Sequence, residues 1–301
     1  MKLAVTGATG FVGSHLVDAA LVAGHRIGAL TRREQPPRDG LAWIAGDLHD
    51  TAALERLVDG ADAVVHVAGV ITGHTTEAFE EGNVEGTLTM LAAATAGGVR
   101  RFVHVSSLAA REPKLSLYGA SKCRSEELVM RSGLDWAIVR PPAVYGPGDK
   151  ETLELFRMAK LGVMLMPPKG RVSVIHADDL ARLLLALAGP EAPSGVLIEP
   201  DDGKAGGWTH REFARALGNA VGTRPAIVSS PGILLRIAAR ADQLLRRDKA
   251  KLTPDRAAYF SHRNWVVEPK RGAPPALWKP QVQTQQGLDA TAAWYRDRGW
   301  L

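Results

Sequence analysis

Short apolar runs alternate with amphipathic segments along the first half of the chain. The runs have the length of β-strands, whereas the segments between them repeat apolar residues at helical spacing. This pattern predicts strands near residues 2–6, 26–30, 42–45, 63–67, 101–106 and 135–139, and helices near 13–23, 51–57, 77–97 and 118–132. Strands that alternate with helices form a parallel sheet covered on both faces. We therefore expect an α/β fold with a doubly wound parallel sheet.

A glycine-rich turn joins the first predicted strand to the first predicted helix. Gly7, Gly10 and Gly13 follow a G-x-x-G-x-x-G spacing. Such glycines permit a tight turn, a close approach of the backbone to a pyrophosphate, and close packing of helix on strand. Free N–H groups at the helix N-terminus favour the negative charge of that pyrophosphate. The turn therefore predicts a Rossmann-type dinucleotide site, with cofactor contacts at Gly7, Thr9, Gly10, Phe11, Val12 and Gly13.

The end of the second predicted strand indicates which dinucleotide binds. In dinucleotide folds an acidic residue at this place holds the ribose hydroxyls of NAD. This chain has Thr31, Arg32 and Arg33 instead. Guanidinium groups pair with a phosphate through charged, forked hydrogen bonds. We therefore expect these three residues to favour NADP(H), with NAD(H) possible; the alternative is a solvated loop with two incidental arginines.

A tyrosine and a lysine lie four residues apart on a later predicted helix. Tyr118 and Lys122 therefore share one face of that helix. A free tyrosine has a pKa near 10, and a neighbouring ammonium group lowers that value. A side chain that carries a proton, beside a cofactor that carries hydride, is suited to the interconversion of alcohols and carbonyls.

Several further segments resemble the extended branch of the short-chain dehydrogenase/reductase superfamily, the epimerase/dehydratase-like enzymes. The resemblance covers residues 1 to about 190 and rests on the glycine turn, on Tyr118 and Lys122, and on segments 44–48, 64–69, 83–87, 102–107, 139–148 and 174–180. It implies that Tyr118 moves the substrate proton and that Lys122 lowers the pKa of Tyr118. It also implies that Ser107 binds the substrate oxygen and that Asn83 supports Lys122, directly or through water.

The same resemblance implies further contacts with the cofactor. Asp47 and Leu48 would contact the adenine, and Val67, Ala68 and Gly69 would lie beside the ribose. Lys122 would hold the nicotinamide ribose, with Tyr118 next to it. The remaining residues that the resemblance places at the cofactor are Ser106, Pro141, Ala143 and Val144. Ser106 could instead satisfy only backbone groups.

Two departures from the family narrow the expected reaction. Nucleotide-sugar enzymes of this branch usually carry an asparagine where this chain has Ala143, and dehydratases place an Asp-Glu pair where Leu108-Ala109-Ala110 follows Ser107. Together with the apolar segment 162–168, these departures favour a mid-sized, largely apolar substrate. We expect an NADP(H)-preferring dehydrogenase or reductase similar to hydroxysteroid dehydrogenases and dihydroflavonol reductases. The alternatives are a nucleotide-sugar epimerase with transient hydride transfer and a catalytically silent cofactor-binding sensor or assembly subunit.

The second half of the chain indicates a smaller lobe. Residues 151–170 predict a helix and a loop, and residues 179–188 predict a helix that packs on the sheet. We expect a dinucleotide-binding domain over 1–150, to which 171–199 return, and a substrate-binding lobe made of 151–170 and 200–301. Within this lobe, residues 233–247 predict a basic amphipathic helix. It would cover the substrate pocket or, alternatively, lie on an anionic membrane surface.

Composition excludes some classes of function. The net charge is +5, but the basic residues are dispersed, so we expect no nucleic-acid partner. The single cysteine, Cys123, excludes an internal disulfide and fits a reducing, cytoplasmic location. The apolar runs are interrupted by charges, so no membrane insertion is expected. His66, His104 and His176 lack metal-ligand spacing, so no metal is expected. The family resemblance suggests a homodimer formed through helices that include the Tyr118 helix.

Overall fold

The computed structural model describes residues 1–73, 75–167, 169–229, 258–259 and 261–301. These residues form two compact units, and the chain passes between them several times. Unit 1 consists of Met1–Pro141, Asp178–Pro200 and Arg271–Lys279, and unit 2 consists of Pro142–Ala177, Asp201–Lys270 and Pro280–Leu301. The amphipathic helix predicted over 233–247 lies outside the described residues.

Unit 1 is built on a parallel sheet of seven strands. Their order is β11-β6-β5-β4-β1-β2-β3, so the direction of strand addition reverses between β1 and β4. The strands are β1 (Lys2–Thr6), β2 (Arg26–Thr31), β3 (Leu41–Ala45), β4 (Ala63–His66), β5 (Arg101–Val105), β6 (Asp135–Val139) and β11 (Val196–Ile198). The prediction of a doubly wound parallel sheet is confirmed. Ligands of such sheets bind at the carboxyl ends of the strands, where the order reverses.

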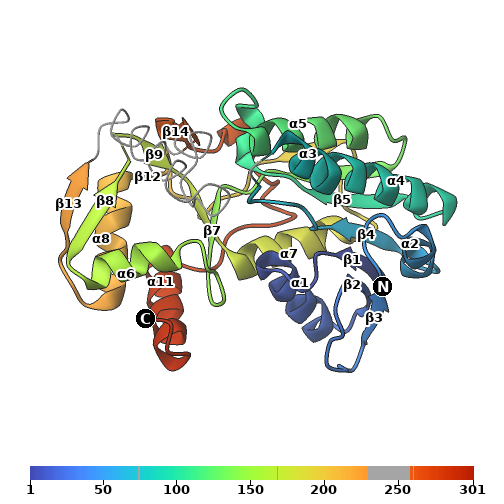
Figure 1. Ribbon diagram of the computed structural model, residues 1–301, viewed down its shortest axis with the longest axis horizontal. Helices are drawn as coiled ribbons and strands as arrows, with labels where there is room; N and C mark the ends of the chain where they lie inside the picture. Colours follow the sequence, from blue (N-terminus) through green and yellow to red (C-terminus); the bar gives the residue numbers. More distant parts are fainter. Residues whose placement is uncertain (74, 168, 230–257, 260) are drawn as a thin grey trace. The chain divides into compact units, whose positions relative to one another are not determined.

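Helices cover both faces of this sheet (Figure 1). On one face α2 (Thr51–Val58), α4 (Gly86–Ala96) and α5 (Leu117–Met130) pack in sequence against each other. Their buried side chains, among them Leu57, Met90 and Val129, form one hydrophobic core with Phe102 of β5. On the other face lie α1 (Phe11–Val22) and α7 (Ala177–Ala188). Both faces of the sheet are therefore buried, which explains why its strands are mostly apolar.

The single helix predicted over 77–97 is wrong in detail. The segment consists of α3 (Thr76–Phe79), a π-helical turn η1 (Glu80–Glu85) and α4. Two glycines permit the close packing of this region: a Cβ at Gly82 would lie 2.3 Å from the Val70 side chain, and one at Gly86 would lie 2.6 Å from that of Leu48. A π-helical turn inserted between α-helical segments is frequent at functional sites. Here it contains Asn83, which is buried.

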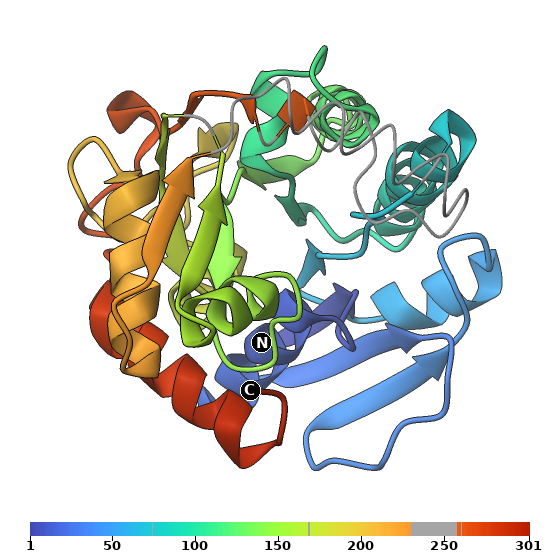
Figure 2. The same ribbon diagram turned by 60° about the vertical axis from the view of Figure 1, so that its left-hand side comes forward.

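The described part of unit 2 contains short strands and three longer helices. The strands are β7 (Ala143–Tyr145), β8 (Val163–Met166), β9 (Arg171–Val172), β10 (Val174–His176), β12 (Trp208–Thr209), β13 (Ala226–Ser229) and β14 (Asn264–Trp265). They form the pairs β10-β7 and β13-β8 and the three-stranded sheet β12-β9-β14. Figure 2 shows β8 and β13 side by side, with α6 (Leu153–Lys160) and α8 (His210–Val221) packed against β8. With α11 (Thr284–Asp297), these helices enclose a core that includes Phe156, Leu217 and Tyr295.

Two shorter helices complete the described fold. The turn η2 (Leu108–Arg111) follows β5, and η4 (Pro269–Arg271) lies where the chain returns to unit 1. Within the described ranges, no helix is both long and apolar enough to cross a lipid bilayer.

Candidate active site

The turn between β1 and α1 has the tight packing that a pyrophosphate cradle needs. Gly7 adopts a left-handed backbone conformation with φ of 72°, and the N–H of Gly10 donates to its carbonyl oxygen over 3.0 Å. A Cβ on Gly7 would lie 2.6 Å from the Ala68 nitrogen, and one on Gly13 only 2.0 Å from the Gly7 oxygen. Gly10 starts α1 through its backbone alone. The residues present therefore fit a dinucleotide pyrophosphate at the N-terminus of α1.

The end of β4 lies next to this cradle. The Ala68 N–H donates to Oγ1 of Thr6 over 3.2 Å, which ties the segment to the end of β1. A Cβ at Gly69 would lie 2.8 Å from Oδ1 of Asn83 and 3.6 Å from Nζ of Lys122. The predicted ribose segment, Asn83 and Lys122 are therefore brought together, although their sequence positions are far apart.

The residues predicted to contact the adenosine half lie at the ends of β2 and β3. The Thr31 hydroxyl donates to the Arg33 carbonyl oxygen over 2.7 Å, which orders the turn, and the side chains of Arg32 and Arg33 are exposed. Asp47 is also exposed, and its Oδ1 accepts the His49 N–H over 2.9 Å. Since β1, β2 and β3 are neighbours in the parallel sheet, these residues share one edge with the cradle.

The predicted catalytic side chains meet where β5 ends against α5. Ser116 begins α5 by accepting the Gly119 N–H over 2.9 Å. Tyr118 follows in the first turn, and its hydroxyl is hydrogen-bonded with Ser107. One turn later, Nζ of Lys122 donates to the Val105 carbonyl oxygen over 2.8 Å. Ser107, Tyr118 and Lys122 therefore form one cluster at the carboxyl edge of the sheet.

Burial controls the charges in this cluster. It raises the pKa of Tyr118, while the hydrogen bond with Ser107 acts in the opposite direction. It also lowers the pKa of Lys122 to about 8, against the charge of Glu126, which raises it. The lowering of the Tyr118 pKa by Lys122 that the family implies stays a prediction.

Asn83 occupies the centre of the π-helical turn. Its Oδ1 accepts the Val70 N–H over 2.7 Å, and its Nδ2 donates to the Val70 carbonyl oxygen and to Oγ of Ser121 over 3.0 and 2.9 Å. The amide thus joins the segment after β4 to the helix that bears Tyr118 and Lys122. Support of Lys122 through water stays a prediction.

Sequence reasoning missed a buried carboxylate beside this cluster. The Ser106 hydroxyl donates to Oε1 of Glu126 over 2.5 Å, and Arg140 donates to both Glu126 oxygens. Arg140 also lies 3.5 Å from Oε1 of Glu199, a residue with 1% of its surface exposed. The position of Glu126, four residues after Lys122, is the one signal that could have indicated it.

The last predicted cofactor residues are divided between the units. Pro141 ends the first segment of unit 1, and its carbonyl oxygen accepts the Leu108 N–H over 2.9 Å. Ala143 and Val144 belong to unit 2, where they form β7 and pair with Val174 and Ile175 of β10.

The three histidines that lack metal-ligand spacing pack within the protein. His66 lies between the hydroxyls of Thr6 and Thr87, at 2.8 and 3.1 Å, and its ring stacks on His104 with centroids 5.5 Å apart. Burial lowers the pKa of His66 to about 3. His176 contacts the ring of Tyr145. The described part of the chain contains no cluster of histidine, cysteine or carboxylate side chains that could hold a metal.

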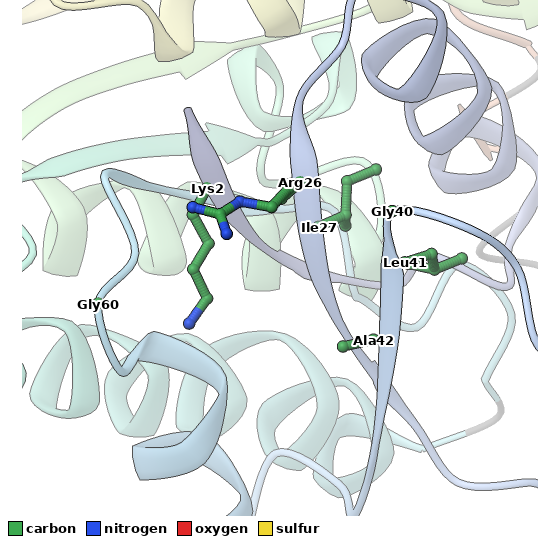
Figure 3. Close-up of a pocket in the computed structure, with 7 residues that line it drawn as sticks. All are labelled: Lys2, Arg26, Ile27, Gly40, Leu41, Ala42 and Gly60. Carbon is green, nitrogen blue, oxygen red and sulfur yellow. The ribbon is translucent and has the colours of Figure 1, made fainter.

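A pocket of about 570 Å³ lies at the opposite edge of the sheet (Figure 3). It is lined by residues at the beginnings of three strands, including Lys2 of β1, Arg26 of β2 and Leu41 of β3. The catalytic cluster lies at the carboxyl ends of the strands, so this pocket is separate from it.

Comparisons with known proteins identify the family of this chain. Residues 3–195 match the NAD dependent epimerase/dehydratase family. The chain is 38% identical to a ceramide reductase of Caulobacter vibrioides, over 99% of this chain and 96% of that protein. It is 28% identical to a 4-hydroxy-2-methyl-3-oxo-4-farnesyl-3,4-dihydroquinoline-1-oxide ketoreductase of Stigmatella aurantiaca, over 96% and 95% of the two chains.

A solved structure shows the same fold. It is that of a dTDP-glucose 4,6-dehydratase double mutant from Streptomyces venezuelae with NAD bound, which is 25% identical with a TM-score of 0.71 over 100% and 98% of the two chains. The resemblance drawn from the sequence motifs is confirmed. The chain belongs to the NAD dependent epimerase/dehydratase family and is an NAD(P)-dependent enzyme of the extended short-chain dehydrogenase/reductase type.

Proposed function

We propose that the protein is an NADP(H)-preferring reductase that interconverts a ketone and a secondary alcohol on a largely apolar substrate. The observation that carries the proposal is the cluster in which the Tyr118 hydroxyl is hydrogen-bonded with Ser107, beside the buried ammonium group of Lys122. The names of the relatives add the substrate class. One is a ceramide reductase and the other a ketoreductase of a farnesylated compound, so both names combine reduction with a long hydrocarbon group.

The residues of the cluster would divide the proton chemistry among them. When bound, the nicotinamide supplies hydride to the carbonyl carbon or accepts it from the alcohol. Ser107 and Tyr118 would bind the substrate oxygen, and the phenol of Tyr118 would donate its proton as negative charge develops there. The ammonium group of Lys122 would stabilise the phenolate that remains.

The residues that follow Ser107 argue against a sugar dehydratase. Leu108, Ala109 and Ala110 follow it in η2, and all three are buried. Dehydration of a sugar needs acidic and basic side chains near the reacting carbons, and this stretch offers only aliphatic ones. A ketone flanked by hydrocarbon makes no such demand.

The exposed arginines after β2 support the preference for NADP(H). We expect that replacing both Arg32 and Arg33 by alanine raises KM for NADPH about 10- to 100-fold, since the two exposed guanidinium groups together should contribute about as much as one charged hydrogen bond to the 2′-phosphate, roughly 1.5–3 kcal/mol. KM for NADH should change little. Arg38→Ala is the control, because Arg38 is also exposed but pairs with Asp18. An equal loss with both cofactors would contradict the assignment.

The function itself is tested by following NADPH oxidation with a panel of ketones. The panel contains the ketone that corresponds to a ceramide, an isoprenoid-substituted ketone and a nucleotide sugar. We expect turnover of at least one long-chain ketone with net NADPH consumption. Conversion of the nucleotide sugar to its epimer without net redox change would establish the epimerase alternative instead.

A further inference from the structure

Glu126 is a buried carboxylate that the proposed proton chemistry does not use. It lies in α5, one turn beyond Lys122, with 1% of its surface exposed. Its Oε1 accepts hydrogen bonds from Oγ of Ser106 over 2.5 Å and from Nε of Arg140 over 2.8 Å. Its Oε2 accepts a second bond from Arg140, over 2.6 Å. A buried carboxylate with three charge-assisted or hydroxyl bonds has a fixed position.

This carboxylate and Lys122 hold consecutive residues at the end of β5. Lys122 donates to the carbonyl oxygen of Val105, and Glu126 accepts the hydroxyl of Ser106. The next residue is Ser107, which accepts the Ala109 N–H and is hydrogen-bonded with Tyr118. One helix, α5, therefore carries Tyr118 and also fixes the backbone that places Ser107 beside it.

Arg140 extends the support to the neighbouring strands. It follows β6, and its backbone N–H donates to the Ile198 carbonyl oxygen at the end of β11 over 2.8 Å. Its Nη1 lies 3.5 Å from Oε1 of Glu199. Arg111 lies 3.6 Å from Oε2 of the same carboxylate, and Arg271 lies 3.8 Å from its Oε1. The ends of β5, β6 and β11 are thus joined through two buried carboxylates.

The charge of Glu126 also acts on Lys122. Burial disfavours the ammonium form of Lys122, and the negative charge of Glu126 opposes that effect. Among the described residues, the other titratable groups near Lys122 are His66 of β4 and His104 of β5, on which the charge of Lys122 acts, and Tyr118, one turn earlier on the same helix. Burial lowers the pKa of both imidazoles, so they are neutral near pH 7 and do not replace the charge of Glu126.

We propose that Glu126 is a positioning residue for the reductase site, which aligns Ser107 through Ser106 and holds a negative charge one helical turn from Lys122. The inference rests on the proposed function only for its kinetic readout. Neither role requires Glu126 to touch substrate or cofactor.

The first test is Glu126→Gln, which keeps the shape of the side chain and removes its charge. We expect kcat to fall about tenfold or more and its alkaline limb to move to lower pH by about one unit, since Lys122 then loses its proton more readily. Glu127→Gln is the matched control: it makes the same charge change one residue further along the helix, at an exposed position. Identical profiles for the two variants would overturn the proposal.

Ser106→Ala distinguishes the alignment of Ser107 from the effect of the Glu126 charge on Lys122. It also provides a test if Glu126→Gln does not fold. It removes the hydroxyl bond but keeps the carboxylate beside Lys122. For Ser106→Ala we expect a several-fold loss of kcat with an unshifted alkaline limb. Glu126→Asp, which keeps the negative charge, should retain more activity than Glu126→Gln. A Ser106→Ala enzyme with the kcat of the original protein would remove the alignment role.

The titration of Lys122 can be measured without substrate, which tests the role of Glu126 separately from the proposed function. Lysine labelled with ¹³C at the ε carbon reports the titration of Lys122 by NMR, and the signal is assigned by its loss in Lys122→Arg. In Glu126→Gln the midpoint should move to lower pH, and in Glu127→Gln it should stay. If no ketone is reduced but the midpoint moves, the proposed function fails and the role of Glu126 stands. If the midpoint stays in both variants, the role of Glu126 fails.

Discussion

Replacing Tyr118 by phenylalanine is expected to reduce kcat by about 10²- to 10⁴-fold, the usual contribution of a positioned proton donor. The variant loses the phenolic proton and its hydrogen bond with Ser107. The aromatic ring remains, with its centroid 6.2 Å from that of Phe79, so the helix should keep its position. NADPH affinity, measured by the fluorescence of the bound cofactor, should change little because the glycine cradle is untouched.

Tyr295→Phe is the matched control for this change. Tyr295 is buried in the core of unit 2, and its hydroxyl donates to the Asp149 carbonyl oxygen over 2.6 Å. Its loss leaves a buried acceptor unpaired, which costs about 1–3 kcal/mol of stability. We expect a lower melting temperature and an almost unchanged kcat. If Tyr118→Phe retained as much activity as Tyr295→Phe, the proton would have to come from another group.

The sheet was predictable because its strands are buried on both faces. Ala4, Val64 and Val103 are fully buried in β1, β4 and β5, so the sequence there is mostly apolar and ends at glycines or polar residues. The glycine turn was predictable for a related reason. A Cβ at Gly7 or Gly13 would meet backbone atoms closer than any real contact, so no other residue fits these positions.

The π-helical turn around Asn83 was not predictable from periodicity. Phe79, Asn83, Thr87 and Met90 are all buried, at spacings of three and four residues that an uninterrupted α-helix would also give. The turn depends on close packing against Val70 and Leu48, which are distant in sequence. The spacing of hydrophobic residues along the chain does not indicate which distant residues will pack against the helix.

The environment of Ser106 shows a second limit. Glu126 pairs with Arg140, and Arg140 lies close to Glu199, which is far along the chain and directly follows a strand of only three residues. In the sequence each of these residues resembles an ordinary exposed charge. Their burial follows from the way in which β5, β6 and β11 end at one edge of the sheet. Ion pairs of this kind become visible only after the strand order is known.

Gly13→Ala is expected to remove most of the affinity for NADP(H). The added Cβ would lie 2.0 Å from the Gly7 oxygen and 2.7 Å from the Gly7 carbonyl carbon, and a backbone cannot retreat as a flexible side chain can. The turn that carries the Gly10 to Gly7 hydrogen bond would have to open. Overpacking of this kind costs about 1–3 kcal/mol. When this cost is lost from the binding free energy of NADP(H), the dissociation constant of the cofactor rises about 10- to 100-fold.

Two other glycines separate the loss of the cradle from a general effect of alanine. A Cβ on Gly28, in the middle of β2, would lie 3.5 Å from both the Ile44 side chain and the Leu57 oxygen, an ordinary contact, so Gly28→Ala should bind NADPH like the original protein. Gly10→Ala, with its Cβ 3.2 Å from the Gly7 oxygen, should give an intermediate loss. Fluorescence titration and thermal melting of all three variants test this order. An affinity for NADPH that is unchanged in Gly13→Ala would mean that the cofactor does not depend on this turn, because the turn cannot accept the methyl group without moving.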